Sequence, residues 1–308
     1  MHADITEALG QQAGHREGPI VRLFDGPYVT ADGRRREVPE GSKQLLAFVA
    51  LRRRRVDRRQ ASGTLWPGGD EERAAGNLRS ALWRLRRAGI DVLLADKWSL
   101  ALRTDVYVDL HLMDQWATRL INGTASAEDL AISPPWADVL ELLPGWYDDW
   151  VLVERERLRQ RMLHALEELS RALLAAGRFA DAVEAAIVAM SAEPLRESAQ
   201  RVLIEAHLAE GNLSEARRIW REYRDLVHRE LGVNPSGKLL EVLDTAMRPE
   251  AEDTGARGRP GRPQALRRTQ LVLQRQLCHA GGLSCGKVAR TYAVVECGAA
   301  PDLGSGIR

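Results

Sequence analysis

Five arginines lie within one short segment, "DEERAAGNLRSALWRLRRAG", residues 70–89. Leu78, Leu82 and Leu85 recur there at helical spacing, so they form an apolar stripe that must face a core. The opposite face then carries Arg73, Asn77, Ser80, Arg84 and Arg87 one turn apart, with Arg79, Trp83 and Arg86 beside them. A nearly pure cationic face suits a polyanion. On a helix in the major groove, an arginine can donate two hydrogen bonds to guanine O6 and N7, and an asparagine can recognise adenine in the same bidentate way.

Other cations are better placed for phosphates, which set position but carry no sequence information. These are Arg52 to Arg55, at the end of the first helix, and Lys97 in a hairpin. The predicted DNA-binding set is therefore Arg54, Arg55, Arg73, Asn77, Arg79, Ser80, Arg84, Arg86, Arg87 and Lys97. We expect Trp83 to pack on the domain's own core; the alternative is that it lies along a sugar edge.

The elements around this helix predict a winged helix-turn-helix. Residues 20–24 and 28–38 are expected as strands, with a hairpin signal at Asp32-Gly33. Helices are expected over 43–53 and 58–66 and within 70–89, with Ser42, Asp57 and Asp70 as their N-caps. A hairpin is expected over 91–102, with its turn at 95–98. Strands, three helices and a terminal hairpin place the DNA-binding domain at residues 20–111, with the third helix as the recognition helix.

Residues 112–248 are nearly all helical and carry an internal repeat. Gly177 and Gly211 are 34 residues apart, and the same offset pairs Ala182 with Ala216 and Leu169 with Leu203. Phe179 with Leu213 and Leu174 with Leu208 complete the set of matched pairs. This is the tetratricopeptide period, in which glycine closes the turn between two helices and alanine lets them approach closely. The predicted fold class is mainly α with a small β part: a winged helix-turn-helix followed by an all-α tetratricopeptide-like domain.

Charge is divided between these halves. Lys and Arg number 18 against 12 Asp and Glu over residues 20–111, and 16 against 23 over 112–248, in a chain of 308 residues with a net charge of +1. A basic part before an acidic one indicates that one half meets nucleic acid or a membrane surface. Residues 1–19 are expected to be flexible, and the Gly-, Pro- and Arg-rich residues 249–308 to be disordered. No signal peptide or membrane span is recognised, so a cytoplasmic location is expected.

Other motifs carry little chemistry. "GVNPSGK", residues 232–238, has phosphate-loop spacing, but Leu239 stands where Ser or Thr must hold magnesium and no strand precedes it.

The histidines are scattered singly, and Cys278, Cys285 and Cys297 lack paired spacing, so no metal, cofactor or disulfide framework is expected. "RGRP" at 257–260 has the core of a minor-groove hook and would add only affinity. We predict that the chain is not an enzyme.

The order of several motifs resembles the Streptomyces antibiotic regulatory protein (SARP) family. They are "VRLFDGPYVTADGRRREV", "KQLLAFVAL", "LWPGGDEERAAGNLRSALWRLRR", "LLPGWYDDWVLVERERLRQRMLHALEELSRALLAAGRFADAVEAA" and "ELGVNPSGKLLEVL", and the likeness covers about residues 20–245. It implies a winged helix of the response-regulator type joined to a bacterial transcriptional activator domain, with Asn77, Arg79, Arg84, Arg86 and Arg87 on the recognition helix. It also makes "GVNPSGK" the closing turn of the activator domain. Trp83 departs from the small residue that members often carry there, and the chain looks like the small form without the ATPase region of larger members.

The resemblance implies a transcriptional activator that binds direct repeats of promoter DNA, as a dimer or in tandem, and recruits RNA polymerase, often for secondary-metabolite and antibiotic genes. Two alternatives stay open from the residues. One is an effector-responsive repressor of the same architecture, and the other is a helical-repeat adaptor whose basic region binds protein.

Overall fold

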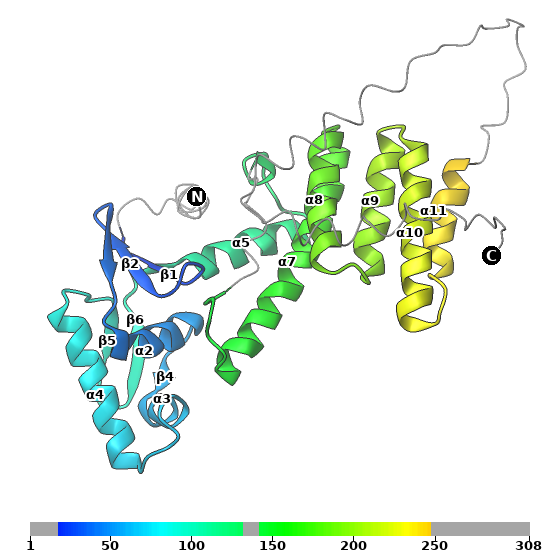
Figure 1. Ribbon diagram of the computed structural model, residues 1–308. Coiled ribbons are helices and arrows are strands. Elements are labelled where there is room, and N and C mark those ends of the chain that lie inside the picture. Colours follow the sequence, from blue (N-terminus) through cyan, green and yellow to red (C-terminus); the bar gives the residue numbers. More distant parts are fainter. Residues whose placement is uncertain (1–17, 132–141, 248–308) are drawn as a thin grey trace, which may run out of the picture. The chain divides into compact units, whose positions relative to one another are not determined.

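The structure is a computed structural model that describes residues 18–131 and 142–247 (Figure 1). The chain divides into two compact units, residues 1–248 and 249–308, and only the first contains described residues. The expectations for the tail, including its cysteines and the "RGRP" segment, and for residues 1–17 fall outside the described ranges.

The first sheet has four strands in the order β3-β2-β1-β7. They are β1 (Ile20–Arg22), β2 (Tyr28–Ala31), β3 (Arg34–Glu37) and β7 (Tyr107–Val108). The expected hairpin is confirmed: β2 pairs antiparallel with β3, and Asp32 and Gly33 have φ values of 51° and 67°, the left-handed pair that a tight hairpin turn requires. β7 adds to β1 in parallel from far along the chain, which the sequence reading did not anticipate.

Three helices follow: α2 (Glu40–Leu51), α3 (Arg58–Leu65) and α4 (Glu71–Arg87). The caps of the last two are confirmed, since Asp57 accepts from the Arg59 and Gln60 N–H groups and Asp70 accepts from the Arg73 N–H at 2.7 Å. The prediction of Ser42 as a cap is wrong. α2 begins after Pro39, so Ser42 falls in the first turn, is fully buried and donates its hydroxyl to the Ala81 carbonyl of α4 at 2.9 Å.

A second, antiparallel sheet forms the wing. Its strands are β4 (Val56–Asp57), β5 (Leu93–Ala95) and β6 (Ser99–Leu102), in the order β4-β6-β5. The β5–β6 pair confirms the expected hairpin with its turn at 95–98. β4 was not expected; it pairs Val56 with Leu100 and so joins the start of α3 to the wing.

The rest of the described chain is helical (Figure 1). Its elements are α5 (Asp109–Ile121), a short 3₁₀ helix η1 (Asp129–Ala131), α7 (Asp149–Ala175), α8 (Phe179–Ala192), α9 (Glu197–Ala209), α10 (Leu213–Leu231) and α11 (Gly237–Met247). Among the described residues, no helix is both long and apolar enough to span a bilayer.

The 34-residue repeat is confirmed as two helix pairs, α7–α8 and α9–α10. Gly177 and Gly211 close the corresponding turns with φ values of 74° and 84°, a conformation that glycine adopts without strain. Ala182 and Ala216 lie fully buried at equivalent places of the second helix of each pair. The fold class predicted from the sequence is therefore correct.

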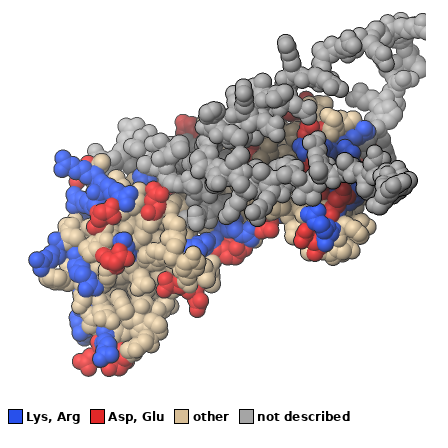
Figure 2. Space-filling model, in the orientation of Figure 1, with Lys and Arg blue, Asp and Glu red and all other residues tan. Residues whose placement is uncertain are grey.

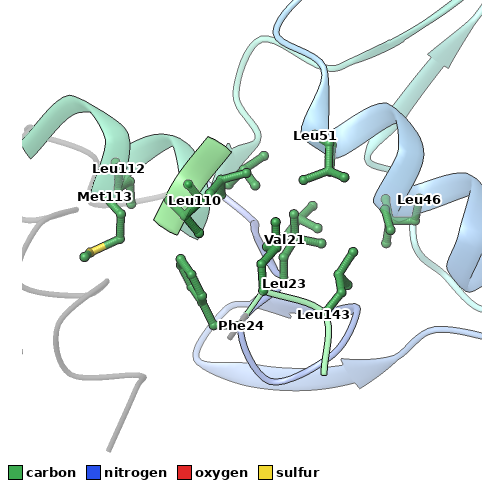
Figure 3. Packing of buried hydrophobic residues seen from close by; sticks show 14 of the residues in the cluster. Val21, Leu23, Phe24, Leu46, Leu51, Leu110, Leu112, Met113 and Leu143 are labelled. Carbon is green, nitrogen blue, oxygen red and sulfur yellow. The ribbon is translucent and has the colours of Figure 1, made fainter. Parts of the chain in front are cut away.

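One hydrophobic core joins the winged region to the first helices that follow it (Figure 3). Figure 3 shows contributions from the β1 region, α2, α5 and the segment before α7: Val21, Leu23, Phe24, Leu46, Leu51, Leu110, Leu112, Met113 and Leu143. Trp116 of α5 is fully buried in the same cluster, and its indole N–H donates to the Asp129 carbonyl at 3.1 Å.

Polar contacts cross the same junction. The Leu143 N–H donates to the Leu23 carbonyl at 3.1 Å, and the Phe48 and Trp150 rings meet edge to face with centroids 5.3 Å apart. Asp114 of α5 forms ion pairs with Arg53, which follows α2, and with Arg161 of α7. The core is continuous across the boundary expected at residues 111 and 112.

A buried carboxylate fixes the start of α5. Asp109 accepts hydrogen bonds from the backbone N–H groups of Leu23 at 2.8 Å, Phe24 at 3.3 Å and Leu110 at 2.7 Å. Burial raises the pKa of Asp109 to about 6, against the opposing effects of these N–H donors and of the Arg22 charge. The sequence reading did not single out this residue.

Candidate nucleic-acid interface

Helix α4 buries the stripe that its sequence predicts. Leu78, Leu82 and Leu85 are buried, together with Ala74 and Ala81. The helix therefore packs one side against α2 and α3 and leaves the other side exposed.

Most of the predicted residues of α4 lie on that outer side. The exposed ones are Arg73, Arg79, Ser80, Arg86 and Arg87, whereas Asn77 and Arg84 are half-buried. The guanidinium groups of Arg73, Arg79 and Arg86 make no hydrogen bond or ion pair with another described residue. These three cations are accordingly available to an outside anion, with no internal bond to break first.

Arg84 differs from the expectation. Its Nη2 donates to the Gly41 carbonyl at 2.9 Å, and its Nε is buried without a partner among the described residues. A Cβ atom on Gly41 would come within 2.8 Å of that Nη2, so the bare glycine makes room for the arginine. In this structure Arg84 ties α4 to the first turn of α2.

The expectation for Trp83 is wrong. The residue lies on the side of α4 opposite the leucines, and 58% of its surface is exposed. The Arg87 guanidinium lies 5.1 Å from the centre of its ring, within cation–π range. The alternative, contact with an outside ligand, is the one that this position allows.

Asp96 organises the tip of the wing. Its carboxylate accepts from the Trp98 and Ser99 N–H groups, both at 2.7 Å, and from the Ser99 hydroxyl at 2.8 Å. These hydrogen bonds, the backbone ones first, hold the pKa of Asp96 below its ordinary value. The tip therefore has a defined conformation before any ligand arrives.

The cations after α2 divide into two pairs. Arg54 is exposed and pairs with no described residue, and Arg55 pairs with Asp96 at 3.1 Å beside exposed Lys97. Arg52 stacks over the Phe48 ring at 4.3 Å, and Arg53 pairs with Asp114. The structure thus places Arg55 at the wing, against Asp96, the neighbour of Lys97, whereas Arg52 and Arg53 contact Phe48 and Asp114.

A basic hairpin next to α4 was missed. Arg34, Arg35 and Arg36 form most of β3, and Arg36 donates from Nη1 to the carbonyl of Gly89, just beyond α4, at 2.9 Å. Figure 2 shows Lys and Arg side chains along this outer edge of the winged region, over the hairpin and α4. Three successive arginines after an Asp-Gly turn were the available signal in the sequence.

The first turn of α4 is acidic. It carries Glu71 and Glu72, which favour the positive end of the helix dipole, and Glu71 pairs with Arg59 of α3 at 3.0 Å. The cationic part of the exposed face therefore begins at Arg73.

The segment with phosphate-loop spacing has an internal partner. Gly232 closes α10 in the left-handed conformation, and the Ser236 N–H, before α11, donates to the Glu197 carboxylate of α9 at 2.8 Å. The Ser236 hydroxyl bonds to the same carboxylate. The Ser236 N–H and hydroxyl are thus already bound to a carboxylate of α9, which fits a closing turn. Within residues 18–131 and 142–247, no three His, Cys, Asp or Glu side chains gather as a metal site.

Comparison with known proteins supports the architecture. Residues 133–245 match the family described as the bacterial transcriptional activator domain. The chain is 27% identical over 226 residues to the regulatory protein AfsR of Streptomyces griseus, an alignment that covers 69% of this chain and 23% of the relative. It thus spans less than a quarter of the length of that regulator.

A solved structure has a similar fold. It is Mycobacterium tuberculosis EmbR in complex with a low affinity phosphopeptide, with a TM-score of 0.57 and 19% identity over 76% of this chain and 66% of that one. The resemblance to the SARP family that the sequence motifs indicate is confirmed: the chain is SARP-like, with a winged N-terminal domain before a bacterial transcriptional activator domain.

Proposed function

We propose that this SARP-like chain is a sequence-specific, double-stranded DNA-binding transcriptional activator without enzymatic activity. The observation that carries the proposal is the outer face of α4, where Arg73, Arg79 and Arg86 have no partner among the described residues and where a preformed wing accompanies the helix in the same domain. In the helix-turn-helix arrangement such a helix enters the major groove, and its arginines reach base edges.

The proposal assigns different tasks to different cations. Arg79 and Arg86 read bases from α4, with Arg73, Asn77, Ser80 and Arg87 on the same face. Arg54, Arg55 and Lys97 contact phosphates, so they contribute affinity and salt dependence at every sequence. Arg84 contributes to DNA binding indirectly, because its hydrogen bond to the Gly41 carbonyl holds α4 against α2.

The helical part supplies the second half of the function. We infer that the tetratricopeptide-like helices α7 to α11 contact RNA polymerase or a second copy of the chain, and that the target genes belong to secondary metabolism. The match of residues 133–245 to the activator domain supports this assignment.

A binding experiment tests the DNA assignment. Genomic fragments that co-purify with the protein supply a duplex, and fluorescence anisotropy then gives its Kd at several salt concentrations beside a scrambled duplex. Arg79→Ala should weaken binding to the selected duplex by about 1–3 kcal/mol and to the scrambled duplex far less. Lys97→Ala should weaken both alike and lower the slope of log K against log salt by about 1.

Arg157→Ala is the matched control, because it removes one exposed arginine charge from α7, outside the proposed interface. Equal losses from Arg79→Ala and Arg157→Ala would refute the groove assignment. No duplex binding by the unaltered chain even at low salt would favour the helical-repeat adaptor.

An in vitro transcription assay distinguishes activation from repression. With the selected promoter on a template and purified RNA polymerase, an activator raises the transcript level in proportion to promoter occupancy. A decrease would identify the repressor of the same architecture.

A further inference from the structure

Trp98 is an exposed tryptophan at the tip of the wing. Its relative exposure is 67%, and it is not among the residues that build or line the hydrophobic core. Three half-buried tryptophans elsewhere in the described chain, by contrast, pack against that core: Trp66, Trp146 and Trp150. A large side chain that contributes so little to packing is free to contact a ligand.

The backbone on both sides of Trp98 is fixed. The Trp98 N–H donates to the Asp96 carboxylate at 2.7 Å, and the Trp98 carbonyl accepts from the Arg58 N–H at 2.9 Å. Arg58 also donates from Nη1 to the Asp96 carbonyl at 3.2 Å. Because the tip is held from two directions, a ligand would meet the indole without a further cost for ordering the loop.

One cation lies against this indole, and a second pairs with the carboxylate two residues before it. Lys97 Nζ lies 4.8 Å from the centre of the Trp98 ring, and Arg55, with 70% of its side chain exposed, pairs with Asp96 at the base of the tip. The nearby carboxylate, Asp96, is occupied by the bonds that it accepts from Ser99 and Trp98. The site therefore combines an apolar ring with positive charge.

We propose that Trp98 is a DNA-contacting residue whose indole packs on the deoxyribose wall of the strand beside α4, while Lys97 and Arg55 hold the adjacent phosphates. This proposal rests on the proposed function. A deoxyribose–phosphate strand alternates an apolar sugar face with an anionic group. The Trp98 indole matches the sugar face, and Lys97 and Arg55 match the phosphates. Trp98 adds affinity that is independent of sequence and of salt, because its contact releases no counterion.

The test uses the complete chain and the selected duplex, with anisotropy measured over a series of salt concentrations. Trp98→Ala should weaken binding to the selected and the scrambled duplex alike, by about tenfold, and leave the salt slope unchanged. Trp98→Phe should keep most of the affinity, since a ring remains. Tyr147→Ala is the control, because Tyr147 is another exposed aromatic residue, at 78%, outside the wing.

A second measurement leaves the wild-type side chain in place. The indole N–H resonance of Trp98 is identified as the one missing from the spectrum of Trp98→Phe, and it should shift on addition of duplex. Thermal melting of Trp98→Ala should match that of the wild type.

Several outcomes overturn the proposal. They are unchanged affinity of Trp98→Ala, a loss that comes with a lower salt slope, or an indole resonance that the duplex leaves in place. A loss of self-association in Trp98→Ala, with DNA affinity intact, would assign the wing tip to a protein partner. If the unaltered chain binds no duplex, the proposed function fails and this inference fails with it, whereas normal binding by Trp98→Ala removes this inference alone.

Discussion

Asp109 gives a prediction whose size follows from its contacts. The carboxylate is 2% exposed and accepts three backbone N–H groups, two from the β1 side and one from its own helix. Asp109→Ala leaves all three donors buried without their acceptor, and an unsatisfied buried group costs about 1–3 kcal/mol. We expect the free energy of unfolding to fall by about 3 kcal/mol or more.

The same carboxylate makes stability depend on pH. Its pKa is raised from 3.8 to about 6 in the folded chain, so between these values the folded state binds more protons than the unfolded state. The stabilisation from this group is fully present below the unfolded pKa and is lost as the pH rises through the folded pKa. Between about pH 4.5 and about pH 7.5 the loss amounts to about 2 kcal/mol.

Asp109→Asn isolates this term, because the amide does not titrate. Urea unfolding of the wild type and of Asp109→Asn at both pH values gives the difference in their unfolding free energies, and other carboxylates cancel. The wild type should lose about 2 kcal/mol relative to Asp109→Asn on going to the higher pH. A constant difference, or a change of the opposite sign, would refute the assignment of the raised pKa to Asp109.

Two further predictions concern α4 and the helical repeat. Arg84→Ala removes the bond to the Gly41 carbonyl and should lower the unfolding free energy by about 1 kcal/mol. Arg86→Ala should leave the unfolding free energy unchanged and weaken DNA binding. Equal melting temperatures of the two variants would contradict the anchoring role of Arg84. Gly177→Ala should cost about 1–2 kcal/mol, because an alanine is strained at a φ of 74° although nothing lies within 4 Å of its Cβ. Gly63→Ala, inside α3 with equally open space, should be neutral or slightly stabilising in the same thermal unfolding assay, and a similar loss at both glycines would disprove the conformational argument.

The elements that the sequence predicted are those with local causes. Asp57 and Asp70 cap their helices because an N-cap needs only a short side chain and the N–H groups two or three residues ahead. The leucine stripe of α4 and the glycine turns of the repeat follow from spacing in the same way. Each depends on residues close together in the chain.

Several of the errors concern contacts between distant segments. Arg84 has the same spacing as its neighbours on the outer face, but its direction depends on where the first turn of α2 falls, 43 residues earlier. The parallel pairing of β7 with β1 and the role of Asp109 also need partners more than eighty residues away. The prediction of Ser42 as an N-cap failed for a different reason, because α2 begins before Ser42, directly after Pro39.

The shared core has a consequence for how such genes can recombine. α5 places Leu112, Met113 and Trp116 in the cluster that also contains Val21 and Phe48. A crossover at codon 111 would separate these partners. Each half would then carry an uncovered apolar surface in the chimaeric protein. We expect viable chimaeras with other regulators to inherit α5 and its Asp109 anchor together with the N-terminal strands.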